Sequence, residues 1–259
     1  MAGYDPLPGQ SPIDLGKALP IDYKFPPDHV RLNWTHPEKG KPNEEGPHGR
    51  EIEFKDSKNT IFVKLPGHQH QTEFTLAKLH FHAPGEHRMN DVQSTLELHI
   101  VHAAEEEDPL NPGEYRKIYA VLGIMVEPKT EKLVETAASR DTDVFRKIRE
   151  KFEEVEETKG DCEPDFDFDP YELLPFEAQT PMIEAAFWRY EGSLTSDRFD
   201  ANVGHVSWFV LKVPREIKEP DLSQWVGTLK HKAKLSQPLD RRFVFFHPGG
   251  PPDSPGEIA

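Results

Sequence analysis

Cysteine is nearly absent from the sequence. Cys162 is the only one among 259 residues, so no disulfide can form within the chain. Disulfides are a feature of proteins from oxidising compartments. We therefore expect a cytoplasmic protein, with a secreted chain whose leader has been removed as the alternative.

Long hydrophobic runs and an excess of basic residues are missing as well. No apolar run approaches the roughly 20 residues of a membrane-spanning helix, and the N-terminal segment lacks the basic and apolar regions of a signal peptide. The 46 acidic and 31 basic residues give a formal charge of −15. Because nucleic-acid binding depends on clustered Lys and Arg, we expect neither a membrane nor a nucleic acid as partner.

Turn-forming residues, in contrast, are plentiful. The 25 prolines and 17 glycines are spread along the chain, which is typical of many short strands joined by turns. Apolar patterns predict strands at residues 51–54, 60–65, 73–82, 95–102, 118–126 and 206–213. Only residues 142–157 have the spacing of an amphipathic helix. We expect one β-rich domain over residues 1–259, with its core at about 9–242 and a loose C-terminal tail at 243–259.

Histidines are concentrated in the segment KLHFHAPGEHRMNDVQSTLELHIVH, residues 78–102, which contains five of the thirteen. Alternate residues of a strand share a face, so His80 and His82 point in the same direction. The same alternation assigns Phe74, Leu76 and Lys78 to their face.

A second predicted strand contains His99, with Glu97 and Val101 on the same face. If the two strands are neighbours in one sheet, His80, His82 and His99 converge. Three neutral imidazoles and one open position describe a catalytic zinc site, whereas a structural zinc site is closed by cysteines that this chain lacks. Glu97 can accept the second ring N–H of His99, which makes that imidazole a better ligand.

His87 and His102 lie outside this arrangement. His102 belongs to the opposite face of its strand, with Leu98 and Ile100. We interpret both as ordinary structural histidines.

A cupin site is the competing metal hypothesis. His80-x-His82-x3-Glu86 matches the first half of a cupin motif, in which the glutamate binds iron or manganese. Cupins have glycines where this sequence has Phe74 and Gln93, and the second half of the motif is missing. The zinc hypothesis is therefore preferred.

The segments LHFHAPGEH and LELHIVHA closely resemble the zinc site of α-class carbonic anhydrases. Seven further motifs occur in the order of that family and extend the resemblance over nearly the whole chain. They are GQSPIDL at 9–15, EIEFKDS at 51–57, YAVLGI at 119–124, FDPYELLP at 168–175, YEGSLT at 190–195, VSWFVLK at 206–212 and QPLDRR at 237–242. The resemblance implies a β-dominated α+β fold, a single domain around a large, mostly antiparallel twisted central sheet with a few short peripheral helices.

The resemblance also implies an activity, the zinc-dependent reversible hydration of carbon dioxide to bicarbonate and a proton. His80, His82 and His99 would bind Zn²⁺, and Thr195 would accept a hydrogen bond from zinc-bound hydroxide and donate one to Glu86. The substrates and products would be carbon dioxide, bicarbonate and water, and sulfonamides and small anions would inhibit. The oligomeric state is not implied.

Two further groups of residues acquire roles from the resemblance. His48 corresponds to the family's proton shuttle, with His68 and His70 nearby as alternatives. Carbon dioxide is small and has no net dipole, so its binding surface should be mainly apolar. The residues that match this surface are Val101, Val121, Leu194, Thr195, Ser196, Val206 and Trp208.

Several positions depart from the family pattern. Lys78 replaces a glutamine that supports the first zinc ligand, and an ammonium cannot accept a ring N–H. Gly46 and Glu51 replace two asparagines, and Ser196-Asp197-Arg198 follows Thr195 in place of Thr-Pro-Pro. The alternative to an active enzyme is a catalytically weak or inactive carbonic-anhydrase-like binding domain.

Overall fold

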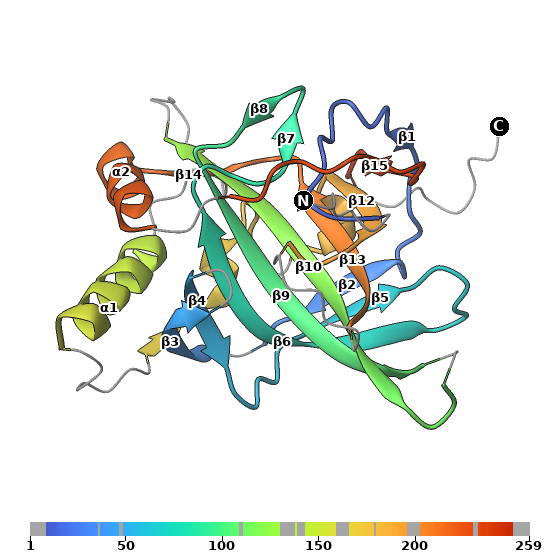
Figure 1. Ribbon diagram of the computed structural model, residues 1–259, viewed down its shortest axis with the longest axis horizontal. Helices are drawn as coiled ribbons and strands as arrows, with labels where there is room; N and C mark the ends of the chain where they lie inside the picture. The colour runs from blue at the N-terminus through green and yellow to red at the C-terminus, as the bar shows by residue number, and fades with distance from the viewer. Residues whose placement is uncertain are drawn as a thin grey trace, which may run out of the picture.

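Three long strands cross the middle of the molecule side by side (Figure 1). They are β6 (Gln71–His82), β9 (Leu96–Glu107) and β10 (Tyr115–Pro128). The computed structural model describes residues 9–35, 37–46, 49–108, 111–129, 138, 143–158, 166–178, 180–195, 203–229 and 233–250. The strands predicted at 73–82, 95–102 and 118–126 are confirmed, and each is longer than expected.

Thirteen strands of the described residues form one sheet, in the order β1-β15-β12-β13-β10-β9-β6-β4-β3-β11 with β14, β2 and β5 off this path. On the β10 side lie β13 (Val203–Leu211), β12 (Phe187–Gly192), β15 (Phe245–His247), β1 (Ile21–Asp22) and β14 (Arg215–Ile217). On the β6 side lie β4 (Gly49–Phe54), β3 (Glu38–Gly46), β11 (Phe166–Phe168), β5 (Thr60–Lys64) and β2 (Val30–Asn33). A separate hairpin consists of β7 (Arg88–Met89) and β8 (Val92–Gln93).

The sheet is mostly antiparallel, as expected, but it is mixed. Three pairs are parallel, β1 with β15, β10 with β13 and β10 with β14. The other pairs of this sheet are antiparallel. The interior positions of β10 and β13 agree with their continuous apolar sequences, because such strands are buried on both faces.

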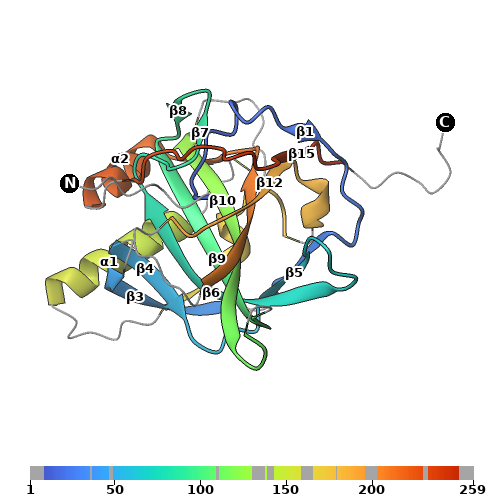
Figure 2. The same cartoon turned by 45° about the vertical axis from the view of Figure 1, so that its right-hand side comes forward.

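Two α-helices lie together at one side of the sheet in both views (Figures 1 and 2). Helix α1 (Val144–Thr158) confirms the predicted amphipathic helix, whereas α2 (Glu219–Thr228) was not predicted. Trp225 of α2 is fully buried, 4.2 Å from the ring of Phe81, and its indole N–H donates to the carbonyl of Phe145 in α1 at 3.0 Å. Two short 3₁₀ turns, η1 (Pro170–Leu173) and η2 (Met182–Glu184), complete the helical elements, and no helix among the described residues is long and apolar enough to span a membrane.

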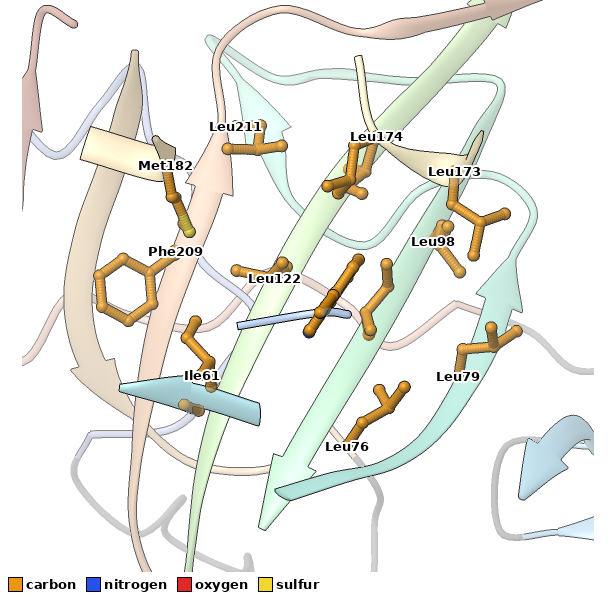
Figure 3. Packing of buried hydrophobic residues seen from close by; sticks show 14 of the residues in the cluster. Ile61, Leu76, Leu79, Leu98, Leu122, Leu173, Leu174, Met182, Phe209 and Leu211 are labelled. Atoms are coloured by element: carbon orange, nitrogen blue, oxygen red, sulfur yellow. The ribbon is translucent and has the colours of Figure 1, made fainter. Parts of the chain in front are cut away.

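The sheet separates two clusters of buried apolar side chains. Figure 3 shows the larger cluster, in which Leu79, Leu98 and Leu122 project from β6, β9 and β10 towards Leu173 and Leu174. The smaller cluster belongs to the opposite face and includes Val101, Val121 and Trp208. Alternation along each strand therefore divides the buried residues between two environments.

A register shift between Leu76 and Lys78 corrects one assignment made from the sequence. Lys78 lies opposite Val101, on the face of His80, whereas Leu76 lies opposite His102 on the other face. Phe74 and Leu76 are buried in the larger cluster and do not share the face of the histidines. Strict alternation failed because a bulge adds one residue to one strand and reverses the side chains beyond it.

The C-terminal segment is also more ordered than predicted. Phe245–His247 form β15, which pairs with β12 and β1, so the expected loose tail does not begin at residue 243. The His247 ring explains this placement, because its Nδ1 accepts from the Phe25 N–H at 3.0 Å and its Nε2 lies 2.7 Å from the Ile183 carbonyl. Residues 251–259 lie outside the described part of the chain.

Candidate metal centre

Three histidines converge on one face of the sheet. The pairing of β6 with β9 sets His80 directly opposite His99, and His82 follows two residues after His80 on the same strand. The ring centroids are 4.9 Å apart for His80 and His82, 5.1 Å for His80 and His99, and 4.7 Å for His82 and His99. One nitrogen from each ring belongs to a group whose atoms all lie within 4.8 Å of one another.

The spacing of the nitrogens fits a tetrahedral zinc ion. His99 Nδ1 lies 3.2 Å from His80 Nε2. Ligand nitrogens at about 2.0–2.1 Å from a tetrahedral zinc are separated by about 3.3–3.4 Å. All three rings are buried, at 3%, 3% and 0% exposure for His80, His82 and His99. Neutral imidazoles held in this way suit a divalent cation.

Glu97 fixes the tautomer of His99. Its Oε1 lies 2.8 Å from His99 Nε2, and a carboxylate can only accept at this nitrogen. The ring hydrogen therefore resides on Nε2, which leaves the lone pair on Nδ1, the atom that faces His80. Full burial raises the pKa of Glu97, but His87 and His99 outweigh that effect and hold it well below its usual range. The predicted supporting role of Glu97 agrees with this geometry.

His87 was interpreted from the sequence as an ordinary structural histidine outside the site, but it contacts Glu97. Its Nδ1 lies 2.6 Å from Glu97 Oε1, and its backbone N–H donates to Glu97 Oε2 at 2.8 Å. On its other side Nε2 lies 2.7 Å from the hydroxyl of Tyr190, which in turn lies 3.1 Å from Ser11 Oγ. Strand alternation could not reveal this role, because His87 lies in the loop 83–87 between β6 and β7, outside any strand.

Glu86 and Thr195 are brought together although 109 positions separate them in the sequence. Glu86 is 1% exposed and Thr195 is 5% exposed. Burial raises the pKa of Glu86 to about 7, and hydrogen bonds from the Lys234 backbone and the Thr195 side chain oppose the increase. Lys234 N donates to Glu86 Oε1 at 2.8 Å, and His82 Nδ1 lies 3.4 Å from the same oxygen. No side-chain pattern could have revealed Lys234, since it acts through its backbone.

An apolar surface lies beside the histidines. Val101, Val121, Val206 and Trp208 belong to the smaller buried cluster, and Leu194 packs against it. The Trp208 ring is 4.9 Å from the His99 ring, and its indole N–H donates to the Ser193 carbonyl at 3.0 Å. These five predicted residues therefore share one environment next to His99.

The β4 side of the same face is charged. Glu51 lies directly opposite His80, and its two carboxylate oxygens lie 3.1 and 2.9 Å from Lys78 Nζ. Lys78 therefore pairs with a carboxylate at the position where the family pattern has a glutamine. His48 and Ser196 lie outside the described residues, whereas His68 and His70 lie in the turn between β5 and β6.

His102 is a buried histidine of the core, as the sequence indicated. It is fully buried, and its Nε2 accepts from the indole N–H of Trp34 at 3.2 Å. Its Nδ1 lies 3.3 Å from the Ala120 carbonyl. Burial lowers the pKa of His102 to about 3, so the ring is neutral near pH 7.

Comparisons with known proteins identify the family of this chain. The chain matches the family described as eukaryotic-type carbonic anhydrase over residues 7–244. It is 25% identical to carbonic anhydrase 1 of Monodelphis domestica over 264 residues, covering 91% of this chain and 87% of that protein.

Two solved structures have the same fold. Carbonic anhydrase Cah3 from Chlamydomonas reinhardtii in complex with acetazolamide superposes with a TM-score of 0.60 and 25% identity, over 92% of this chain and 90% of that one. Dioscorin complexed with ascorbate superposes with a TM-score of 0.60 and 20% identity, over 92% of this chain and 85% of that one.

Proposed function

The chain belongs to the eukaryotic-type carbonic anhydrase family, and we propose that it catalyses the reversible hydration of carbon dioxide to bicarbonate and a proton. His80, His82 and His99 would hold the catalytic zinc. The observation that carries the proposal is the convergence of three buried imidazoles, with His99 Nδ1 3.2 Å from His80 Nε2 and the hydrogen of His99 directed to Glu97.

The metal and the protein would contribute different parts of the chemistry. Zinc supplies a Lewis acid that makes water acidic enough to react as hydroxide near neutral pH. Thr195 donates its hydroxyl hydrogen to Glu86 when that carboxyl is ionised, so the Thr195 oxygen is left as an acceptor towards the site. An acceptor held in this way orients the hydrogen of a nearby hydroxide away from the substrate.

The apolar surface explains how carbon dioxide would be bound. Val101 and Val121 are each 1% exposed and lie on the face of His99. Together with Leu194, Val206 and Trp208 they offer no hydrogen-bonding side chain except the Trp208 indole, which is already bound to Ser193. A surface of this kind suits a substrate without a net dipole and gives water few partners.

Removal of the proton requires a further group. A group of pKa near 7 releases its proton to bulk water at only about 10³ per second, because proton return is limited by diffusion near 10¹⁰ M⁻¹s⁻¹. The known turnover of carbonic anhydrase is about 10⁶ per second. We propose His48 as the shuttle, and His48→Ala should slow turnover in weak buffer, with partial rescue by added imidazole. An unchanged rate in weak buffer would remove His48 from the mechanism.

The main rival is a carbonic-anhydrase-like protein that binds ligands without catalysis. Dioscorin has this fold and was solved with ascorbate, and the Glu51–Lys78 pair alters the polar side of the site in this chain. The discriminating experiment combines metal analysis with a carbon dioxide hydration assay. The proposal predicts about one zinc per chain and activity inhibited by acetazolamide or small anions. Stoichiometric zinc with no sulfonamide-sensitive activity would establish the rival. As a separate point, we propose that the active protein is located in the cytoplasm.

A further inference from the structure

Two opposite charges stand beside the first metal ligand. Glu51 and Lys78 flank His80, because Glu51 is its cross-strand partner on β4 and Lys78 precedes it by two residues on β6. Their side chains form an ion pair with Nζ–Oε distances of 3.1 and 2.9 Å. Both residues lie on the face of the three histidines.

The pair is unusually well enclosed for an ion pair. The Glu51 side chain is 1% exposed and that of Lys78 is 24% exposed. Charges of this kind are screened far less by water and salt than a surface pair. Each charge therefore acts strongly on a cation held by the neighbouring imidazoles, Glu51 by attraction and Lys78 by repulsion.

The surrounding backbone is shaped for the Glu51 carboxylate. A Cβ atom at Gly46 would lie 2.5 Å from Glu51 Cδ and 2.8 Å from Glu51 Oε2. No other residue type fits at position 46 while Glu51 keeps this conformation. The Glu51–Lys78 ion pair in this conformation therefore depends on glycine at position 46.

A neighbouring carboxylate does not compete for Lys78. Glu53 is the cross-strand partner of Lys78, but its Oε1 accepts from Asn43 Nδ2 at 2.8 Å. Lys78 reaches instead to Glu51, diagonally across the two strands. The arrangement directs the ammonium towards the carboxylate next to His80.

We propose that Glu51 and Lys78 are a compensating pair of positioning residues that sets the affinity of the histidine site for zinc and for anions. This inference rests on the proposed function, since it assumes that His80, His82 and His99 hold the metal. While both residues are present their charges offset each other. Removing either one leaves the other charge acting alone beside the metal ligands.

The test uses the full chain and three variants, Glu51→Gln, Lys78→Gln and the double variant. The zinc dissociation constant is measured by competition with a chelator, and thiocyanate binding is measured from the visible spectrum of the cobalt(II)-substituted protein. Glu51→Gln should weaken zinc binding about tenfold and tighten thiocyanate binding, whereas Lys78→Gln should change both constants in the opposite direction. The double variant should return to within about threefold of the original chain, because the two single changes are opposite in sign and offset each other.

The outcomes separate this inference from the proposed function. Equal constants in all four proteins, or shifts of the same sign in both single variants, would overturn the compensating pair while leaving the zinc site intact. A chain that binds no zinc in any form would overturn the proposed function and this inference together. Gly46→Ala gives a second route, since it displaces the carboxylate without removing a charge, and it should weaken zinc binding in the same direction as Glu51→Gln.

Discussion

Strand β9 contains two fully buried histidines on opposite faces, His99 and His102. His99 faces a carboxylate, with Nε2 2.8 Å from Glu97, and directs its other nitrogen towards two more imidazoles. His102 accepts from the Trp34 indole at 3.2 Å in an apolar cluster. Burial alone therefore does not identify a metal ligand. The partner of the second nitrogen decides whether a buried imidazole is prepared for a cation or is a neutral part of the core.

Substituting the histidine on the metal-binding face gives the largest expected effect. His99→Ala should abolish zinc retention and carbon dioxide hydration, because it removes one of three protein ligands and exposes the Glu97 carboxylate to an empty space. His102→Gln should retain about one zinc per chain and most activity, since its amide can still accept from Trp34. Metal analysis after dialysis and a hydration assay measure both.

Two outcomes of these variants would contradict the contrast between His99 and His102. Zinc retained at full stoichiometry in His99→Ala would remove His99 from the ligand set. Zinc lost in His102→Gln, with unfolding unchanged, would mean that the two faces are not independent.

A smaller effect is expected when the partner of His99 is changed and His99 itself is kept. One oxygen of Glu97 accepts from the backbone N–H groups of Glu86 and His87, and the other lies next to the His87 and His99 rings. Glu97→Gln therefore turns an amide N–H towards at least one donor. Zinc affinity should fall about 10- to 100-fold. Glu38→Gln is the control, since Glu38 is also buried and accepts from Asn59 but lies at the start of β3. Equal zinc dissociation constants in the two variants would show that Glu97 does not support zinc binding.

The next effect in size is a loss of folding stability in acid that His102 should cause. The pKa of His102 falls from 6.5 to about 3 through burial, so between these values the unfolded chain binds the extra proton. This contribution to stability is complete above pH 6.5 and is lost as the pH falls towards 3. Between pH 7 and pH 5 the loss should be about 2 kcal/mol, at about 1.4 kcal/mol per pH unit below 6.5.

Urea unfolding at pH 7 and pH 5 measures this loss. The original chain should lose about 2 kcal/mol more than His102→Gln over this interval. His29, whose pKa is also lowered to about 3 by burial, titrates equally in both proteins and cancels in the difference. An identical loss in the two proteins would show that His102 is not protonated on unfolding.

Much of the site could be predicted because it follows strand alternation. His80, His82, His99 and Glu97 were assigned from a period of two, and the pairing of β6 with β9 agrees. The contact of Glu86 with Thr195 depended on resemblance, since no local pattern joins residues so far apart. The pairing of Lys78 with Glu51 was not predicted, because the two residues were considered separately, each as a replacement of a different family residue.

The rest depended on structure that leaves no local signal. The register shift near Lys78 moved Phe74 and Leu76 to the other face, although nothing in the sequence marks a bulge there. Strand β3 contains Gly40 and Pro42 and no apolar alternation, so its backbone pairing alone forms the strand. In both cases pairing with neighbouring strands outweighs the preference of the local sequence.

The smallest expected effect concerns the partner of His102. Trp34→Phe keeps an aromatic ring in the core but removes the N–H that donates to His102 Nε2 at 3.2 Å. The variant should lose about 1–3 kcal/mol of stability, because a buried acceptor is left without its donor. Its zinc dissociation constant should stay within about twofold of the original chain, in contrast to the 10- to 100-fold change for Glu97→Gln. Unfolding in urea and chelator competition measure the two quantities, and a large change in zinc affinity would mean that the core face acts on the metal site through β9.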